Sequence, residues 1–284
     1  MLPSTVLTFT IALGASLFMA WVIGAGSSGA TPFAPAVGAN AISILRAAFL
    51  VGFLVFAGAI LQGANVSEAV GTGLVEGVTL PPAGAIIGLG IGAGLMALGI
   101  YTGYPIATAF TVTGAVIGVG LALGGTPAWT KYQEIAALWL LTPILGGGTA
   151  YVLASILPRP DVPERVSIPI LGGFVGFVLA TIDFAVLGGS GRALSLAAVL
   201  GPAMPGGWLA ASMGIGLGVV AVLRVAVERN QPRAIRGFLL VLGGLVAFSA
   251  GGSQVGLAIG PLLPLLDDLA IPITGALIGG GLGM

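Results

Sequence analysis

The feature that most constrains this chain is a series of long apolar stretches separated by short polar connections. A bilayer core about 30 Å thick needs roughly 20 mostly apolar residues per helix. Only 6% of the residues are charged and 57% are hydrophobic, whereas about a quarter of an ordinary soluble domain is charged. The sequence therefore predicts an all-α, polytopic transmembrane protein. We expect about nine spans, near residues 4–24, 43–62, 82–100, 105–124, 134–156, 166–188, 207–227, 236–250 and 270–284.

Charge balance and residue types exclude several function classes. Nine basic residues balance nine acidic ones, whereas a nucleic-acid-binding protein needs a basic excess to neutralise phosphates. The sequence contains no cysteine and no histidine, which excludes disulfides, thiolate or imidazole metal sites and nucleophile–histidine pairs. We also find no titratable groups clustered at one membrane depth. We therefore expect no enzyme, no catalytic residue, no bound metal and no nucleic-acid partner.

The distribution of arginine predicts how the chain is oriented. Cytoplasmic loops of membrane proteins carry an excess of Lys and Arg. Seven of the nine basic residues lie on one side of the predicted spans, namely Arg46 and six arginines in two connections. Lys131 and Arg192 lie on the opposite side. This pattern predicts a multi-pass protein of the cell (plasma) membrane with its N-terminus outside. The six arginines in these connections are Arg159, Arg165, Arg224, Arg229, Arg233 and Arg236.

Two short segments resemble each other at an offset of 227 residues. Residues 24–29 and 251–256 each follow an apolar stretch, contain Gly and small polar residues, and precede an apolar run with two prolines. The eighth predicted span comes seven spans after the first, an odd number, so the two copies run in opposite directions. Paired Gly/Pro-interrupted segments in inverted halves are typical of transporter binding sites. The alternative is two unrelated Gly-rich helix ends.

Broken helices at membrane depth have a specific chemistry. An unwound segment must line protein or a watery cavity, because lipid satisfies no backbone hydrogen bonds. The N–H groups at the start of a half-helix carry partial positive charge and suit an anion. Residues 24–29 also match GxGxxG, but no strand precedes them and no acid follows about 20 residues on, as a dinucleotide site requires. We therefore expect the two segments to face each other around an anion near mid-membrane.

Three stretches resemble a known family. Residues 251–261, GGSQVGLAIGP, resemble the duplicated G-A-N-D-V-A-N-A-I-G-P signature of the inorganic phosphate transporter (PiT) family, which also includes sulfate permeases. Residues 24–31 resemble the first copy, and residues 105–115, PIATAFTVTGA, resemble the family motif P-V-S-T-T-H-x-I-V-G-A. The resemblance implies inverted-topology repeats and secondary active transport of a tetrahedral inorganic oxyanion by alternating access.

The departures from the family pattern bear on the substrate. The family's Asn-Asp pair is Gly26-Ser27 in one copy and Ser253-Gln254 in the other, and the family's His position is Phe110. Sulfate only accepts hydrogen bonds, whereas phosphate near neutral pH also donates to carboxylates, so uncharged donors favour sulfate slightly over phosphate. Phosphate remains the alternative within the same fold. An anion channel or a non-transporting membrane protein are alternatives of another class.

The candidate site follows from these segments. Asp183 is a candidate for the coupling ion, because we place it inside the sixth span, where ionisable groups are functional by default. The alternative is a helix-end carboxylate that reaches water or pairs with Arg192. The coupling ion itself is a proton or sodium, and no other cofactor is expected. The predicted substrate-binding residues are Gly24, Gly26, Ser27, Ser28, Gly29, Thr108, Thr111, Gly251, Ser253, Gln254 and Gly256.

The spacing of the motifs predicts the domain organisation. Residues 1–157 form a first transmembrane repeat, 158–235 form connecting helices and cytoplasmic loops, and 236–284 begin a second inverted repeat. The Pro105 motif follows Gly24 by 81 residues, so its second copy would fall near position 332, beyond Met284. We therefore expect a truncated second repeat. The expected partners are the oxyanion and the lipid bilayer, and a homodimer is one option for the assembly.

Overall fold

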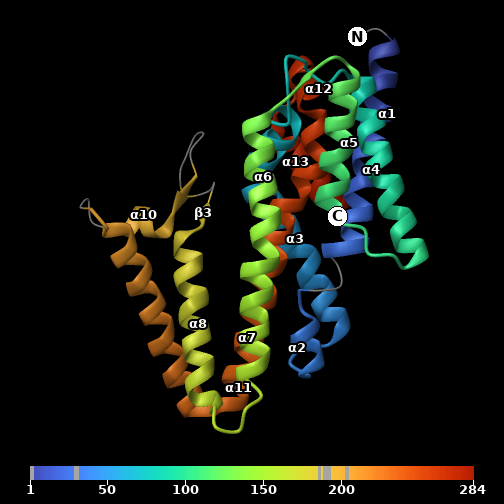
Figure 1. Ribbon diagram of the computed structural model, residues 1–284. Coiled ribbons are helices and arrows are strands. Elements are labelled where there is room, and N and C mark those ends of the chain that lie inside the picture. The colour runs from blue at the N-terminus through green and yellow to red at the C-terminus, as the bar shows by residue number, and fades with distance from the viewer. Residues whose placement is uncertain (1–2, 29–31, 185–186, 188–192, 202–204) are drawn as a thin grey trace. The chain divides into compact units, whose positions relative to one another are not determined.

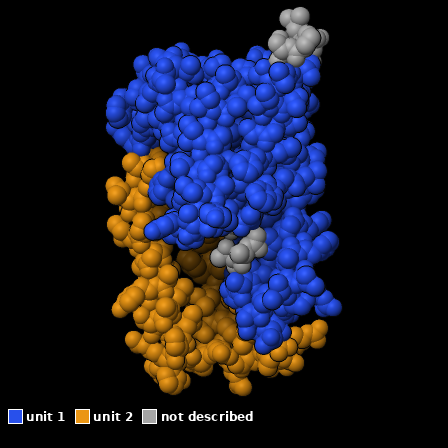
Figure 2. All heavy atoms as spheres, turned by 90° about the vertical axis from the view of Figure 1, so that its right-hand side faces the viewer, with its two compact units in different colours: residues 1–134, 242–284 blue, residues 135–241 orange. Residues whose placement is uncertain are grey.

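The computed structural model describes residues 3–28, 32–184, 187, 193–201 and 205–284 (Figure 1). Within this part of the chain the structure is mainly α-helical, with short π-helical and 3₁₀ segments and two short strand pairs. The prediction of an all-α membrane fold is confirmed. The chain divides into two compact units, residues 1–134 with 242–284 and residues 135–241 (Figure 2). The predicted organisation into repeats stays a prediction.

The first unit combines the N-terminal helices with the C-terminal ones. A π-helical segment, Gly24–Ser28, follows α1, and a 3₁₀ turn, Gly260–Leu262, follows α11. The strands β1 (Val75–Glu76) and β2 (Thr126–Pro127) are antiparallel, with Val75 opposite Pro127. The helices of this unit are α1 (Pro3–Ile23), α2 (Ala34–Gly38), α3 (Ile44–Thr72), α4 (Pro82–Thr102), α5 (Thr108–Ala122), the start of α6 (Trp129–Thr142), the end of α11 (Gly207–Ile259), α12 (Leu263–Asp268) and α13 (Ile273–Gly283).

The second unit is built from the middle of the chain. A second π-helical segment, Pro143–Gly147, joins α6 to α7 (Gly148–Ile156), and α8 (Glu164–Thr181) follows. The strands β3 (Asp183–Phe184) and β4 (Leu194–Ser195) are antiparallel and lead into α10 (Leu196–Leu200). The glycine-rich face of α8 packs closely on α11, because a side chain at Gly173 or Gly176 would collide with Val220 or Val219.

Six helices among the described residues are long and apolar enough to cross a membrane. The apolar helices α5 and α13 are shorter than 18 residues. The predicted sixth span extended to residue 188, which is wrong, because α8 ends at Thr181 and an extended strand follows. The total of nine spans stays a prediction. The six candidate spans are Val6–Gly26, Ile44–Thr72, Pro82–Thr102, Trp129–Ile156, Glu164–Thr181 and Gly207–Asp268.

The seventh and eighth predicted spans belong to one helix, α11, which is interrupted at Asn230. This residue has a non-helical backbone, with φ −158° and ψ 90°. Pro232 lacks an N–H, so it cannot donate to the carbonyl four residues earlier, and a proline is tolerated best in the first turn of a helix. The Arg233 backbone N–H donates to Asn230 Oδ1 at 3.1 Å, which caps the second half of the helix. The kink therefore follows from the local sequence Asn-Gln-Pro-Arg.

The core of the first unit depends on glycine at helix crossings. A side chain at Gly58 of α3 would collide with the Phe248 carbonyl of α11, and one at Gly251 would collide with the Val55 carbonyl of α3. A Cβ at Gly256 would come within 2.7 Å of the Ser67 backbone nitrogen. Small residues allow two helix backbones this close an approach, which stabilises membrane helix pairs through dispersion contacts. The crossing of α3 and α11 thus anchors the C-terminal segments to the N-terminal ones.

Candidate functional site

The first half of the predicted site lies where α1 stops being α-helical. Met19, Val22 and Ile23 are buried at the end of α1, and the next five residues, Gly24–Ser28, form the π-helical segment. Single π-helical turns within α-helices frequently occur at functional sites, because they redirect backbone groups. The helix type therefore changes at the position where we predicted a break, and the predicted unwinding of this segment stays a prediction. The structure describes only the backbone of Ser27 and Ser28, and Gly29 lies outside the described residues.

Gly24 and Gly26 have different surroundings. A side chain at the buried Gly24 would collide with the backbone carbonyl of Met284, so the end of α13 lies directly against this turn. Figure 1 marks the C-terminal end beside the lower part of α1. A Cβ at Gly26 would lie 3.1 Å from Ile100 Cδ1 of α4. Gly24 is thus a packing position, while Gly26 faces α4.

The Pro105 segment begins where α4 ends. Gly103 has a left-handed backbone, with φ 75°, a conformation that glycine adopts without the steric cost of a Cβ. The chain then runs without regular structure through Pro105 to Ala107, and α5 starts at Thr108. Gly99 leaves room for Ile106, because a Cβ there would be 2.8 Å from the Ile106 side chain. The segment is therefore held against the last turns of α4.

A cavity of about 390 Å³ lies between these two segments. It brings together Gly26 and Thr108, two predicted substrate-binding residues that are far apart in the sequence. The lining residues, all in the described part of the chain, include no charged side chain. The described residues that line the cavity are Ala25, Gly26, Met96, Gly99, Ile100, Gly103, Tyr104, Pro105, Ile106 and Thr108.

The N-terminus of α5 gives this cavity its chemistry. The N–H groups in the first turn of a helix have no acceptor in an earlier turn, and they carry partial positive charge. Ala107, at the cap position, supplies no capping side chain. The half-buried Thr108 adds a hydroxyl at the cavity wall. A helix N-terminus that opens into a small cavity is suited to an anion.

Thr111 has a different position from the one that we predicted. Its Oγ1 donates to the Ala107 carbonyl of its own helix at 2.9 Å, and it is not among the residues that line the cavity. The prediction that Thr111 contributes with Thr108 is therefore not supported by the geometry. Thr111 lies one turn further along α5 than Thr108, and its hydroxyl is engaged by its own helix.

The second predicted break, at residues 251–256, is wrong. The helix α11 continues through this segment to Ile259, and the 3₁₀ turn at Gly260–Leu262 comes only with Pro261. Gly251 and Gly256 are buried against α3 and allow close packing instead of unwinding. The exposed Ser253 donates to the Ala250 carbonyl at 3.4 Å. None of Gly251, Ser253, Gln254 and Gly256 lines the cavity described above.

The two copies nevertheless belong to the same unit and both contact α13. A Cβ at Gly280 would lie 2.9 Å from the Val255 side chain, and one at Gly283 would lie 3.0 Å from Ala20 Cβ. Ser16 Oγ of α1 also donates to the Ala258 carbonyl of α11 at 2.8 Å. The ends of α1 and α11 are therefore packed together, although only the first copy opens into the cavity.

Asp183 lies beyond the helix in which we expected it. It is an exposed residue of β3, opposite Ser195 of β4, and the preceding candidate span ends at Thr181. Its predicted position inside the sixth span is wrong, because Ile182 already has an extended backbone. Its predicted partner Arg192 lies outside the described residues. Within the described residues, no group of three or more His, Cys, Asp or Glu side chains could hold a metal ion.

The contribution of α4 to the cavity was missed by the sequence analysis. Met96, Gly99, Ile100 and Gly103 all line it. Their spacing of three or four residues places them on one face of a helix, directly before the Pro105 motif. This spacing was the available signal, but it resembles the helix-packing pattern that is common throughout this glycine-rich chain.

Comparisons with known proteins agree with this architecture. The chain is 27% identical to a protein of Pyrococcus furiosus that carries a phosphate permease name, over 97% of this chain and 69% of that protein. It is 26% identical to the chloroplastic inorganic phosphate transporter 2-1 of Arabidopsis thaliana, over 93% of this chain and 50% of that protein. A solved structure of a sodium-dependent phosphate transporter shares the fold, with a TM-score of 0.73 and 24% identity, over 97% of this chain and 73% of that one.

A family model also matches nearly the whole chain. The matched residues are 23–284, and the model describes the phosphate transporter family. The match begins just before the π-helical segment and includes the Pro105 segment, α11 and α13. The chain therefore belongs to the phosphate transporter family.

Proposed function

We propose that this chain is a secondary transporter of inorganic phosphate, and that the cavity between the π-helical segment and the start of α5 is part of its binding site. The observation that carries the proposal is the position of this cavity. It joins the interrupted end of α1, at Gly26, to the N-terminal turn of α5, at Thr108. Interrupted helices whose N-termini point at an anion are typical of secondary transporters with inverted repeats.

We propose phosphate as the substrate, although the sequence alone slightly favoured sulfate. The relatives are named for phosphate, and no comparison points to a sulfate-transporting variant. The absence of carboxylates is compatible with phosphate, because the protons of phosphate can also be donated to backbone carbonyls. A change from α- to π-helical hydrogen bonding at Gly24–Ser28 alters which carbonyls have partners. The proposed site thus combines N–H donors from α5 with carbonyl acceptors from the end of α1.

Sodium is the proposed coupling ion. A hard cation is bound by oxygen ligands, and interrupted helices in transporters supply backbone carbonyls for this purpose. The shared fold of a sodium-dependent phosphate transporter supports sodium over the proton, the other option from the sequence analysis. In this proposal sodium offsets the negative charge of the phosphate that moves with it.

The proposed orientation places the arginine-rich connections in the cytoplasm and the N-terminus outside. Residues 157–165 and 224–236 contain six arginines and three acidic residues, a net charge of +3. An excess of Lys and Arg in short loops favours the cytoplasmic side of a membrane. In this proposal, the start of α8 and the kink of α11 therefore lie at the cytoplasmic surface.

A flux measurement tests the proposal. The chain is reconstituted into liposomes, and uptake of labelled phosphate is followed with a sodium gradient and, separately, with a pH gradient. We expect uptake that depends on the sodium gradient and is not competed by excess sulfate. Uptake of labelled sulfate in preference to phosphate would contradict the proposed substrate. Uptake driven only by the pH gradient would contradict sodium coupling, and currents far above carrier turnover would favour a channel.

A further inference from the structure

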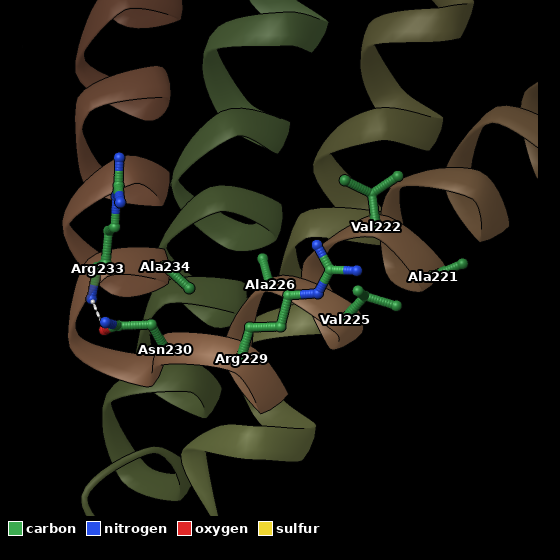
Figure 3. A pocket seen from close by; sticks show the side chains of 8 residues that line it. All are labelled: Ala221, Val222, Val225, Ala226, Arg229, Asn230, Arg233 and Ala234. Carbon is green, nitrogen blue, oxygen red and sulfur yellow. Dashed lines mark hydrogen bonds between the residues drawn. The ribbon is translucent and has the colours of Figure 1, made fainter.

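The kink of α11 creates a groove that the transport cavity does not include. Its volume is about 740 Å³, and it lies in the second unit (Figure 3). The groove contains two arginines, one before and one after Asn230 in the sequence, and it has an apolar wall. The lining residues are Ala221, Val222, Val225, Ala226, Arg229, Asn230, Arg233 and Ala234.

The two arginines of the groove keep their charge available. Among the described residues neither Arg229 nor Arg233 forms an ion pair. Two acidic residues, one next to Arg229 in the sequence and one bonded to Gln231, have other partners. Glu228 accepts from Arg224 Nε at 3.1 Å, and Glu164 at the start of α8 accepts from Gln231 Nε2 at 2.6 Å. The groove is therefore a positively charged site whose neighbouring acids are already hydrogen-bonded.

The wall of the groove is apolar and continues into a candidate membrane span. Val222 is 69% exposed and Val225 is 47% exposed, and both lie on the first half of α11, which begins at Gly207. Figure 3 shows the Arg229 side chain running back along this half, with its guanidinium beside Val222 and Val225. Cationic heads and an apolar surface thus adjoin at the end of a membrane helix.

We infer that this groove binds the headgroup of an anionic phospholipid. A guanidinium group matches the oxygens of a phosphodiester through two parallel N–H donors. In this arrangement Arg229 holds the phosphodiester and an acyl chain lies along Val222 and Val225. Arg233, whose side chain points away from these two valines (Figure 3), adds positive charge on the other side of Asn230. Basic sites between or beside membrane helices on the cytoplasmic side recognise anionic lipid headgroups in this way.

A phospholipid fits this groove better than free phosphate does. Free phosphate is fully solvated and gains nothing from an apolar wall, whereas an acyl chain is stabilised by it. The groove is also open and lies at the surface of the helix, where lipid has direct access. The proposed transport cavity differs, because its described lining residues include no charged side chain and it lies between the π-helical segment and the Pro105 segment.

Native mass spectrometry of the full chain tests this inference. The protein is titrated with phosphatidylglycerol and, separately, with phosphatidylcholine. The test variant is Arg229→Gln/Arg233→Gln. The matched control is Arg159→Gln/Arg165→Gln, which removes the same charge from the same unit but outside the groove. Arg159 donates to the Ser155 carbonyl, and Arg224 is kept so that its pair with Glu228 stays intact.

We expect the test variant to lose about 25-fold in affinity for phosphatidylglycerol, because each Lys or Arg near an anionic surface contributes about fivefold. The control should stay within about twofold of the unmodified chain, and phosphatidylcholine binding should not change in either. Val222→Ser/Val225→Ser should also weaken phosphatidylglycerol binding. Thermal unfolding of each variant checks the fold, and Arg229→Gln alone, with about a fivefold loss, replaces the double variant if that one unfolds.

Three outcomes would overturn the inference. An equal loss in the test variant and the control would mean that only the overall surface charge matters. Displacement of phosphatidylglycerol by millimolar inorganic phosphate would identify free phosphate as the occupant. Unchanged lipid affinity after Val222→Ser/Val225→Ser would show that the apolar wall holds no acyl chain.

Discussion

At the scale of single residues, the candidate site depends on where a side chain is present and where it is absent. Thr108 places a hydroxyl at the cavity wall, whereas Thr111, one helical turn later, donates to its own helix. Gly24 makes room for the backbone of Met284, and Gly26 leaves space in front of Ile100. Thr108 and Thr111 therefore form one pair for comparison by mutagenesis. Gly24 and Gly26 of the π-helical segment form another.

Replacing Thr108 with valine should weaken phosphate binding. The change removes a hydroxyl and keeps the shape, and a hydrogen bond to a charged group contributes about 1.5–3 kcal/mol. We expect the KM for phosphate uptake to rise about tenfold or more. The control is Thr111→Val, which removes a hydroxyl that bonds only within α5 and should change KM less than twofold. Equal effects of the two variants would mean that Thr108 does not contact the substrate.

Replacing Gly26 with leucine should block the cavity. A Cβ at this position already reaches Ile100 at 3.1 Å, so the rest of a leucine side chain would extend into the space next to it. We expect phosphate uptake to be lost, with little change in thermal stability, because Ile100 is a flexible neighbour. Gly14→Leu on the exposed face of α1 meets nothing within 4 Å and should transport normally. Normal uptake by Gly26→Leu would remove this cavity from the transport path.

At the scale of secondary-structure elements, two similar glycine-rich segments behave differently. The sequence Gly-Ala-Gly-Ser-Ser at the end of α1 does change the helix type, whereas Gly-Gly-Ser-Gln in α11 does not. Composition is similar in both, so the difference comes from packing. Glycines 251, 252 and 256 lie against α3, where a continuous helix is stabilised by close contact.

The crossing of α3 and α11 predicts a strong effect of Gly256→Leu. A Cβ here would lie 2.6 Å from Val66 Cγ1 and 2.7 Å from the Ser67 backbone nitrogen, so α11 would be forced away from α3. Overpacking of this kind costs about 1–3 kcal/mol. We expect a lower unfolding temperature in detergent. Gly237→Leu, which meets nothing within 4 Å on the same helix, is the control, and an equally stable Gly256→Leu protein would contradict the observed crossing.

The kink in α11 depends on the cap formed by Asn230. Its Oδ1 accepts from the Arg233 backbone N–H, and loss of such a cap costs about 0.5–2 kcal/mol. Asn230→Ala should therefore lower the thermal stability of the protein, while Asn230→Ser, which keeps a capping oxygen, should restore most of it. Thermal unfolding of the three proteins measures this. Equal stability of the alanine and serine variants would show that Pro232 alone determines the kink.

At the scale of the whole molecule, the sequence was sufficient for the fold class and for half of the site. Low charge and long apolar stretches predicted the membrane helices, because lipid restricts the backbone to helices or closed barrels. The pairing of the Gly24 segment with the Pro105 motif was also predicted through Gly26 and Thr108. What could not be predicted is which glycine-rich segment leaves the α-helical form, because that depends on contacts with distant helices. The end of α8 was also not predicted, because Asp183 follows an apolar run that contains no clear signal for the end of a helix.

The central claim is that phosphate occupies the cavity between the π-helical segment and α5. The chain has no native cysteine, so a single cysteine reports on one place. Ala25→Cys lies in the cavity wall, and Ser253→Cys lies on the exposed face of α11, outside it. The most direct measurement is the rate at which a methanethiosulfonate reagent labels each cysteine, with and without saturating phosphate. The account predicts that phosphate slows labelling of Ala25→Cys and leaves Ser253→Cys unchanged. Protection of Ser253→Cys alone, or of neither, would contradict it.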